Sequence, residues 1–248
     1  MLSKSQISFV KSLHQKKYRK EHGLFLVEGI KSIQEFLVSK YQIQTIFYNK
    51  EFAHLLPKLP TNINLFEVNN AELDKISTLQ TPQGFLAVVS SPKKNVIQAK
   101  DLRNQFTLVL DGVQDPGNLG TIIRTADWFG FKYIICSEDT VEAFNPKTVQ
   151  ATMGSLARVE IFYQNLEKLI DEVKIPIFCA LLDGKSIYKT DWGNEGLIIL
   201  GNEGKGISKE LLVKVNQPVT IPRIGEAESL NVAVSTAIFC SELTRQKK

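Results

Sequence analysis

Ile221 to Leu243 reads I-P-R-I-G-E-A-E-S-L-N-V-A-V-S-T-A-I-F-C-S-E-L. The segment begins as the end of a strand, passes through a turn rich in Gly, Pro and Glu, and continues into an apolar helix that begins near Leu230. The helix is apolar on more than one side, which indicates burial rather than a solvent-facing position. A strand, a turn and a buried helix in this order are typical of an α/β sheet, in which ligands bind at the loops beyond the strands.

Two earlier loops also follow apolar strands. Gly112 to Gly120 comes after the strand Phe106 to Leu110, and Gly201 to Gly206 comes after Leu197 to Leu200. Continuous apolar runs of this kind are typical of parallel strands that are covered on both faces. We therefore expect a parallel sheet with helices on both sides, whose further strands lie at 133–136, 159–163, 177–182 and 219–221.

The three loops do not match the common nucleotide-binding fingerprints. G-N-E-G-K-G is not G-x-G-x-x-G, and neither earlier loop continues into the Lys-Ser/Thr of a P-loop. Cys136, Cys179 and Cys240 stand far apart with no nearby histidine, and all histidines lie in the first quarter of the chain. These patterns favour buried reduced thiols and disfavour a metal site, a dehydrogenase or a triphosphatase.

The first 90 residues form a second α/β pattern. A helix with one buried stripe is predicted over residues 4–20, followed by alternating strands and helices up to Val89, with Asn70 as a helix cap. The composition turns polar from Ser91 to Asn104. We therefore predict an α/β domain over 1–92, a linker over 93–104 and a larger domain over 105–248.

Positive charge is concentrated at the N-terminus. Residues 1–23 carry a local charge of +5, although the whole chain carries +4. A basic segment that contains Tyr18 suits phosphate contacts on nucleic acid, whereas the plain alternative is a solvated helix face. The candidate RNA contacts are Lys11, Lys16, Lys17, Arg19 and Lys20.

The composition is that of a globular protein, with 43% hydrophobic and 23% charged residues in 248. No apolar run approaches the roughly 20 residues of a membrane helix, and no secretion signal follows Met1. The expectation is a cytoplasmic protein without a membrane partner.

Three motifs together resemble a known family. D-G-V-Q-D-P-G-N-L-G-T-I-I-R-T-A, I-I-L-G-N-E-G-K-G-I and I-P-R-I-G-E-A-E-S-L-N-V-A-V-S are similar to the motifs of the SpoU (TrmH-type) RNA 2′-O-methyltransferases of the SPOUT superfamily. The match covers residues 106–243 in the right order. More loosely, residues 11–90 resemble the small substrate-binding domain, related to a ribosomal protein fold, that precedes this domain in many members.

The resemblance implies a deep trefoil knot, a homodimer and S-adenosylmethionine as cofactor. By position in the motifs, the cofactor contacts would come from Gly201, Ile221 and Leu230, together with Leu181, Asn202 and Gly206. Arg223 departs from the family pattern, which usually has an apolar residue there.

The resemblance also assigns the catalytic residues. Arg124 matches the family's catalytic arginine, proposed as a base, although a guanidinium is an easier group for orienting phosphate because it stays protonated. Asn118, Glu203, Ser229 and Asn231 would position the ribose and hold the loops together. Without the resemblance, helix caps would be the simpler interpretation for Asn118, Ser229 and Asn231, and a turn residue for Glu203.

The expected function is methyl transfer from S-adenosylmethionine to a ribose 2′-hydroxyl of structured RNA. Ribosomal RNA is favoured over transfer RNA because of the N-terminal domain, by analogy alone. Methylation of a base nitrogen and a non-catalytic RNA-binding or ribosome-assembly protein remain the alternatives.

Overall fold

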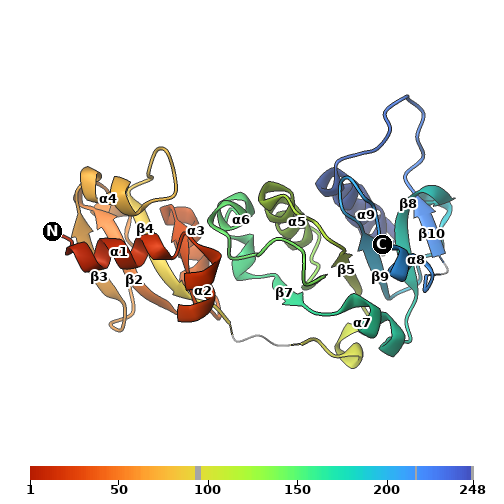
Figure 1. Ribbon diagram of the computed structural model, residues 1–248, viewed down its shortest axis with the longest axis horizontal. Helices are drawn as coiled ribbons and strands as arrows, with labels where there is room; N and C mark the ends of the chain where they lie inside the picture. The colour runs from red at the N-terminus through yellow and green to blue at the C-terminus, as the bar shows by residue number, and fades with distance from the viewer. Residues whose placement is uncertain (93–95, 216, 247–248) are drawn as a thin grey trace. The chain divides into compact units, whose positions relative to one another are not determined.

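The computed structural model describes residues 1–92, 96–215 and 217–246, which form two compact units (Figure 1). The first unit contains the N-terminal residues up to 92 and a later segment, Glu142–Ala157. The second contains the remaining described residues. Nothing in the sequence pattern indicates that 142–157 packs with the N-terminal unit.

The N-terminal unit is built on a mixed sheet of order β1-β4-β2-β3. The central pairs β1–β4 and β2–β4 are antiparallel, and the edge strand β3 runs parallel to β2. Its strands are β1 (Leu24–Glu28), β2 (Ile43–Asn49), β3 (Asn64–Val68) and β4 (Phe85–Ser90), and its helices are α1 (Lys4–Ser12), α2 (Lys16–His22), α3 (Ile30–Leu37) and α4 (Asn70–Ile76).

Both faces of this sheet are covered by apolar side chains. Val10 of α1 and Leu13 at its C-terminal cap pack with alternate residues of the strands, among them Leu26 and Phe47. Phe25, on the opposite face of β1 because strand side chains alternate, contacts the rings of Phe36 and Phe144. This double coverage explains why β1 and most of β4 are buried throughout.

The predicted helix over residues 4–20 is wrong, because the chain breaks into α1 and α2 at Leu13 to Gln15. Arg19 accounts for the break. Its guanidinium is buried and donates hydrogen bonds to the backbone oxygens of Leu13 and His14, at 3.0 and 2.8 Å. A further bond of 2.8 Å joins it to Glu142 within the same unit. A continuous helix would use those carbonyls in its own ladder.

Helix α6 (Pro146–Thr152) also belongs to the N-terminal unit. Asn145 caps it and Pro146 occupies its first position, the place that proline favours in a helix. The predicted cap at Asn70 is displaced by one residue, since Asn69 accepts the capping hydrogen bond from the backbone of Glu72.

The second unit confirms the predicted parallel sheet. Six strands lie in the order β10-β8-β9-β5-β6-β7, and every neighbouring pair is parallel. The strands are β5 (Phe106–Leu110), β6 (Tyr133–Cys136), β7 (Glu160–Tyr163), β8 (Ile177–Ser186), β9 (Gly196–Leu200) and β10 (Gln217–Thr220).

Helices cover both faces of this sheet. On one face, α7 (Leu166–Glu172) and α8 (Lys209–Leu212), which the sequence pattern did not predict, pack on Val109, Ile135 and Ile199. The other covering pair is α5 (Pro116–Trp128) and α9 (Val232–Gln246), which contact each other. Helix α9 begins two residues later than predicted, after Asn231.

The predicted linker over 93–104 contributes to the second unit's core. Ile97 and Leu102 are buried in the cluster under α7 and α8, whereas residues 93–95 lie outside the described residues. Among the described residues, no helix is long and apolar enough to cross a membrane.

The three cysteines are unpaired and buried, as expected. Burial raises the pKa of the Cys179 thiol to about 12, and burial also raises the pKa of the Cys136 and Cys240 thiols. All three therefore remain neutral thiols at physiological pH.

Candidate active site

The three motif loops leave the carboxyl end of one sheet. The loop at 111–115 follows β5, the loop at 201–206 follows the adjacent strand β9, and the segment at 221–231 follows β10. Strand β8 separates β9 from β10. Because parallel strands end at a common edge, residues more than a hundred positions apart meet there.

Asn202 organises the loop after β9. Its side-chain oxygen accepts hydrogen bonds from the backbone of Gly204 and Lys205, at 2.9 and 3.0 Å. Its side-chain nitrogen donates to the backbone oxygen of Gly112 at 2.6 Å, which ties the loop to the one after β5. Two backbone bonds of 2.9 Å to Gly206 close the turn.

Gly201 is required by close packing. A Cβ atom at this position would lie 2.2 Å from the carbonyl carbon of Gly206 and 2.4 Å from the backbone nitrogen of Ile207. Gly206 itself has a φ of +71°, a conformation that L side chains rarely adopt. Both glycines are therefore needed for the shape of this turn.

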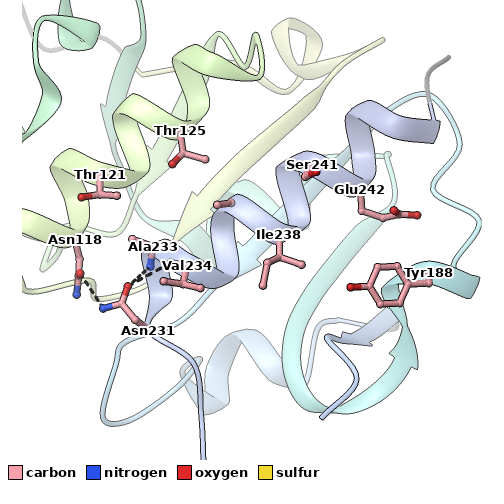
Figure 2. A pocket seen from close by; sticks show the side chains of 11 residues that line it. Asn118, Thr121, Thr125, Tyr188, Asn231, Ala233, Val234, Ile238, Ser241 and Glu242 are labelled. Carbon is pink, nitrogen blue, oxygen red and sulfur yellow. Dashed lines mark hydrogen bonds between the residues drawn. The ribbon is translucent and has the colours of Figure 1, made fainter. Parts of the chain in front are cut away.

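A chain of side-chain hydrogen bonds joins all three motifs. The amide nitrogen of Asn118 donates to a carboxylate oxygen of Glu203 at 2.9 Å. The amide nitrogen of Asn231 donates to the side-chain oxygen of Asn118 at 3.0 Å, as Figure 2 shows. The three residues come from α5, the loop after β9 and the start of α9. We call this set the Glu203–Asn118–Asn231 chain.

Helix caps position two members of this chain. Asp115 caps α5 through a bond of 2.7 Å from the backbone of Asn118, so Asn118 lies in the first turn and is not itself the cap. Asn231 is a cap, because its side-chain oxygen accepts from the backbone of Ala233 and Val234, at 2.9 and 3.3 Å. Its amide nitrogen remains available for Asn118.

Two polar residues that the sequence reasoning did not single out support the loops. Asp111 accepts a bond of 2.7 Å from the backbone of Ser208, and Ser137 accepts one of 2.8 Å from the backbone of Gly112. Both lie directly after strands, at the edge where functional loops gather. That position is the signal by which they could have been found.

The other predicted catalytic residues lie outside this hydrogen-bonded chain. Arg124 is exposed on α5 and, within the described residues, makes no hydrogen bond or ion pair. Ser229 is exposed and makes none either in the described part of the chain. The Arg223 side chain folds back onto its own loop, donating to the backbone oxygen of Ala227 at 3.3 Å.

Strand β8 bulges beside the third loop. Its pairing with β10 jumps from Cys179 to Lys185, which leaves the backbone of residues 180–184 without a ladder partner in β10. Gly184 allows the close approach, since a Cβ there would lie 2.7 Å from the backbone of Pro218. Leu181 and Ile221 are half-buried and Leu230 is 49% exposed.

These residues fit a cofactor that has an apolar ring system and a polar tail. The bulge, the loop at 201–206 and the segment at 221–231 offer backbone donors and acceptors, with apolar side chains between them. In the described part of the chain, no cluster of His, Cys, Asp or Glu could hold a metal ion.

A groove of about 500 Å³ runs between α5 and α9, beginning at the Asn118–Asn231 bond (Figure 2). Thr121, Thr125, Val234 and Ile238 line its length. Tyr188 lies at the end away from Asn118 in Figure 2. Its walls are mostly apolar, and the apolar Val234 of α9 is 49% exposed.

Most of the predicted RNA-contacting residues are exposed. Lys11, Lys16, Lys17 and Lys20 lie on the surface of α1 and α2. Arg19 does not, because its side chain is buried in the ion pair with Glu142. We therefore remove Arg19 from the set of RNA contacts.

Comparison with known proteins gives the family. The model of the SpoU rRNA Methylase family matches residues 105–241, and that of the MRM3-like substrate binding domain matches residues 4–87. The chain belongs to the SpoU methylase family. Its second unit is therefore a SPOUT-type domain, preceded by a substrate-binding domain.

Individual relatives match over almost the whole length of the chain. The chain is 34% identical to the 23S rRNA (guanosine(2553)-2'-O)-methyltransferase RlmP of Bacillus subtilis, over 94% of this chain and 93% of that protein. A TrmH-family structure from Porphyromonas gingivalis has 38% identity and a TM-score of 0.89, with 99% of each chain covered. An AdoMet-bound rRNA methyltransferase from Sinorhizobium meliloti has 29% identity and a TM-score of 0.86, covering 99% of this chain and 96% of that one.

Proposed function

We propose that this protein transfers a methyl group from S-adenosylmethionine to a ribose 2′-hydroxyl of ribosomal RNA. The observation that carries the proposal is the Glu203–Asn118–Asn231 chain, which joins three separate motifs at one edge of the sheet. A scaffold protein would gain little from polar links between exposed loops, whereas a site that must align a nucleophile with a methyl donor needs them. The similarity to RlmP of B. subtilis favours ribosomal RNA.

The cofactor would be held by the loops around β8, β9 and β10. Leu181, Ile221 and Leu230 offer apolar contacts for the adenine ring, and the backbone of Gly201, Asn202 and Gly206 offers hydrogen bonds. The AdoMet-bound S. meliloti relative supports this choice of cofactor. When bound, the sulfonium supplies both the methyl group and its leaving group.

Orienting the RNA ribose is the main catalytic task of the protein's own residues. Arg124 is exposed and has no partner among the described side chains, so its guanidinium is available to bind an RNA phosphate and place the ribose. A guanidinium group suits charge stabilisation better than proton abstraction. Asn118 and Asn231, held by the hydrogen-bonded chain, and the exposed Ser229 would position the ribose hydroxyls.

The N-terminal unit would select the RNA. Lys11, Lys16, Lys17 and Lys20 form an exposed basic surface on a unit that matches a substrate-binding family model. Lysines of this kind contact phosphates and release counterions, so binding should weaken steeply as the salt concentration rises.

A homodimer is part of this proposal. The apolar groove between α5 and α9 and the 49% exposed Val234 support it, because a second copy would cover apolar surface next to the proposed site. The trefoil knot implied by the family resemblance remains a prediction for the segment that joins β10 to α9.

Methyl incorporation tests the function. The wild-type protein with labelled S-adenosylmethionine should methylate ribosomal RNA from cells that lack this gene, and should leave transfer RNA from those cells unlabelled. Arg124→Ala should lower the rate by roughly 100-fold or more while leaving cofactor binding unchanged. Full activity in that variant would remove Arg124 from the mechanism, and absence of labelling by wild type would contradict the function.

A further inference from the structure

A second hollow lies in the N-terminal unit, on the surface formed by α1 and the start of α2. It has a volume of about 670 Å³, within the roughly 300–1,000 Å³ range of ligand pockets. Two of the lining residues are lysines, and none of the described lining residues is acidic. The lining consists of Lys4, Ile7, Ser8, Lys11, Ser12, His14, Gln15 and Tyr18. We call it the α1–α2 pocket.

One face of α1 forms a wall of this pocket. Lys4, Ser8 and Lys11 are spaced four and three residues apart, which places them in a row along the helix. Ile7 is half-buried and packs against the apolar cluster beneath, so it anchors this wall to the core. The row therefore presents two ammonium groups and a hydroxyl from a fixed helix.

The opposite wall comes from the turn and from α2. Its position is fixed, since His14 donates from Nε2 to the backbone oxygen of Ile76 at 2.9 Å and buried Arg19 holds the carbonyls of the turn. Gln15 and Tyr18 then point polar and aromatic groups at the pocket. The break between the two helices therefore creates the corner in which the pocket lies.

Most polar side chains that line the pocket have no hydrogen-bond or ion-pair partner among the described residues. In the described part of the chain, the side chains of Lys4, Ser8, Lys11, Gln15 and Tyr18 make no hydrogen bond or ion pair. An ordinary solvated helix face carries such groups on a convex surface, whereas these line one open hollow. Convergent donors with no internal partner are typical of a binding site.

Aromatic rings gather beside the lysines. The rings of Tyr18 and His22 lie nearly parallel, with an angle of 12° and centroids 6.4 Å apart. Phe9, which is 40% exposed, contacts His22 edge-on at 5.3 Å. The ammonium of Lys17 lies 5.6 Å from the centre of the Tyr18 ring. Tyr18 is half-buried, whereas His22 and Phe9 are exposed, and accessible rings among lysines suit base stacking together with phosphate contacts.

We propose that the α1–α2 pocket binds one unpaired nucleotide of the substrate RNA. Lys4 and Lys11 contact its phosphates, Tyr18 stacks on the base, and Ser8 and Gln15 offer hydrogen bonds to the edge of the base or to the ribose. This inference rests on the proposed function, in which RNA is the substrate. It adds that the pocket prefers single-stranded RNA to duplex RNA. Recognition of unpaired bases by aromatic stacking is the usual way in which proteins read RNA.

Binding to two RNA probes tests the pocket. A short fluorescent oligouridine and a duplex with the same number of phosphates are titrated against the full-length protein. Tyr18→Leu should weaken binding to the oligouridine roughly tenfold and leave duplex binding unchanged, whereas Tyr18→Phe should retain wild-type affinity. Equal affinity of wild type and Tyr18→Leu for the oligouridine would overturn the proposal.

Charge variants test the phosphate contacts. For oligouridine binding, the logarithm of the binding constant falls linearly with the logarithm of the salt concentration. Lys11→Gln should make this slope shallower by about 0.7, as expected for one lost phosphate contact on a single strand. Lys31→Gln, an exposed lysine on α3 outside the pocket, should leave the slope unchanged. Identical slopes for Lys11→Gln and wild type would contradict the assignment of Lys11.

Crosslinking of the wild-type protein tests the pocket even if a variant fails to fold. Irradiation of wild-type protein with bromouridine-substituted RNA should attach the label to Tyr18 or its neighbours in α2, and labels confined to other segments would overturn the proposal. Calorimetry with S-adenosylmethionine separates the two hypotheses. If the cofactor does not bind while the Tyr18 effect persists, the proposed function fails and the pocket stands.

Discussion

The loop at 201–206 and the loop at 222–230 leave the same edge of one sheet but are built in opposite ways. In the first, Asn202 makes three side-chain hydrogen bonds and Gly201 packs against backbone atoms. In the second, every residue is exposed and Ile224 is fully so. Its single internal hydrogen bond, within the described chain, joins Arg223 to Ala227.

This difference divides the site into a rigid part and an open part. The rigid part, which includes β5, β9 and the first turn of α5, is held by its own hydrogen bonds and close backbone packing. Asn231, directly after the open part, links it to the rigid part through one side-chain hydrogen bond to Asn118. Ordering a loop costs conformational entropy, so we expect the cofactor to stabilise the open part when it binds. Figure 1 shows the open loop extending away from the strands of its unit.

Paired glycine substitutions should separate the two loops most clearly. Gly201→Ala places a methyl group where the backbone of Gly206 lies, so it should destabilise the protein by about 1–3 kcal/mol and abolish measurable cofactor binding. Gly225→Ala meets no atom within 4 Å and should change stability by less than about 0.5 kcal/mol. Thermal denaturation measures the stability and calorimetry the cofactor binding. Similar losses of both in the two variants would contradict the difference between the loops.

The link between the two parts can be removed without removing the helix cap. Asn231→Asp keeps a side-chain oxygen for the start of α9, and Asp caps helices as well as Asn does. The variant cannot donate to Asn118, so methyl transfer should fall roughly tenfold while stability stays within about 0.5 kcal/mol. Asn231→Ala, which also loses the cap, should cost about 1 kcal/mol. Unchanged methyl transfer by Asn231→Asp would show that the link has no catalytic value.

Limited proteolysis should reveal the open loop directly. Trypsin should cleave after Arg223 before it cleaves after Lys205, because the former lies in the loop with a single internal bond. Saturating S-adenosylmethionine should slow the cleavage at Arg223 several-fold. Mass spectrometry of the fragments identifies the site, and early cleavage at Lys205 would reverse the assignment of rigid and open parts.

The smallest effect is expected at Cys240, which lies buried in α9 beyond the open loop. Burial raises its pKa, so the thiol should resist alkylation at pH 8 in the native protein. Asn231→Asp should not increase the labelling, because the opening is confined to the loop before the helix. Faster labelling of Cys240 in that variant would mean that α9 itself moves.

Much of the fold could be predicted from apolar periodicity. The parallel sheet and most of its strand positions follow from continuous runs such as Phe106 to Leu110, and the structure confirms them. The break between α1 and α2 was not predicted, because no local pattern shows that Arg19 turns inward to bond the carbonyls of Leu13 and His14 and to pair with Glu142, 123 residues away. The return of 142–157 to the N-terminal unit escaped prediction for the same reason.

The site was predictable to a lesser degree. The motifs placed Asn118, Glu203 and Asn231 in one site, and the structure joins these three residues by hydrogen bonds. Their catalytic and cofactor-binding roles stay predictions. The different rigidity of the two glycine-rich loops depends on tertiary contacts such as Asn202 to Gly112, which no local pattern encodes.

Analysis of the methylated product tests the central claim most directly. Ribosomal RNA from cells that lack this gene is incubated with the protein and methyl-labelled S-adenosylmethionine, then digested to nucleosides and separated. We predict that the label appears in a 2′-O-methylnucleoside and that Arg124→Ala reduces it roughly 100-fold. Label in a base-methylated nucleoside, or no label with folded wild-type protein, would contradict the account.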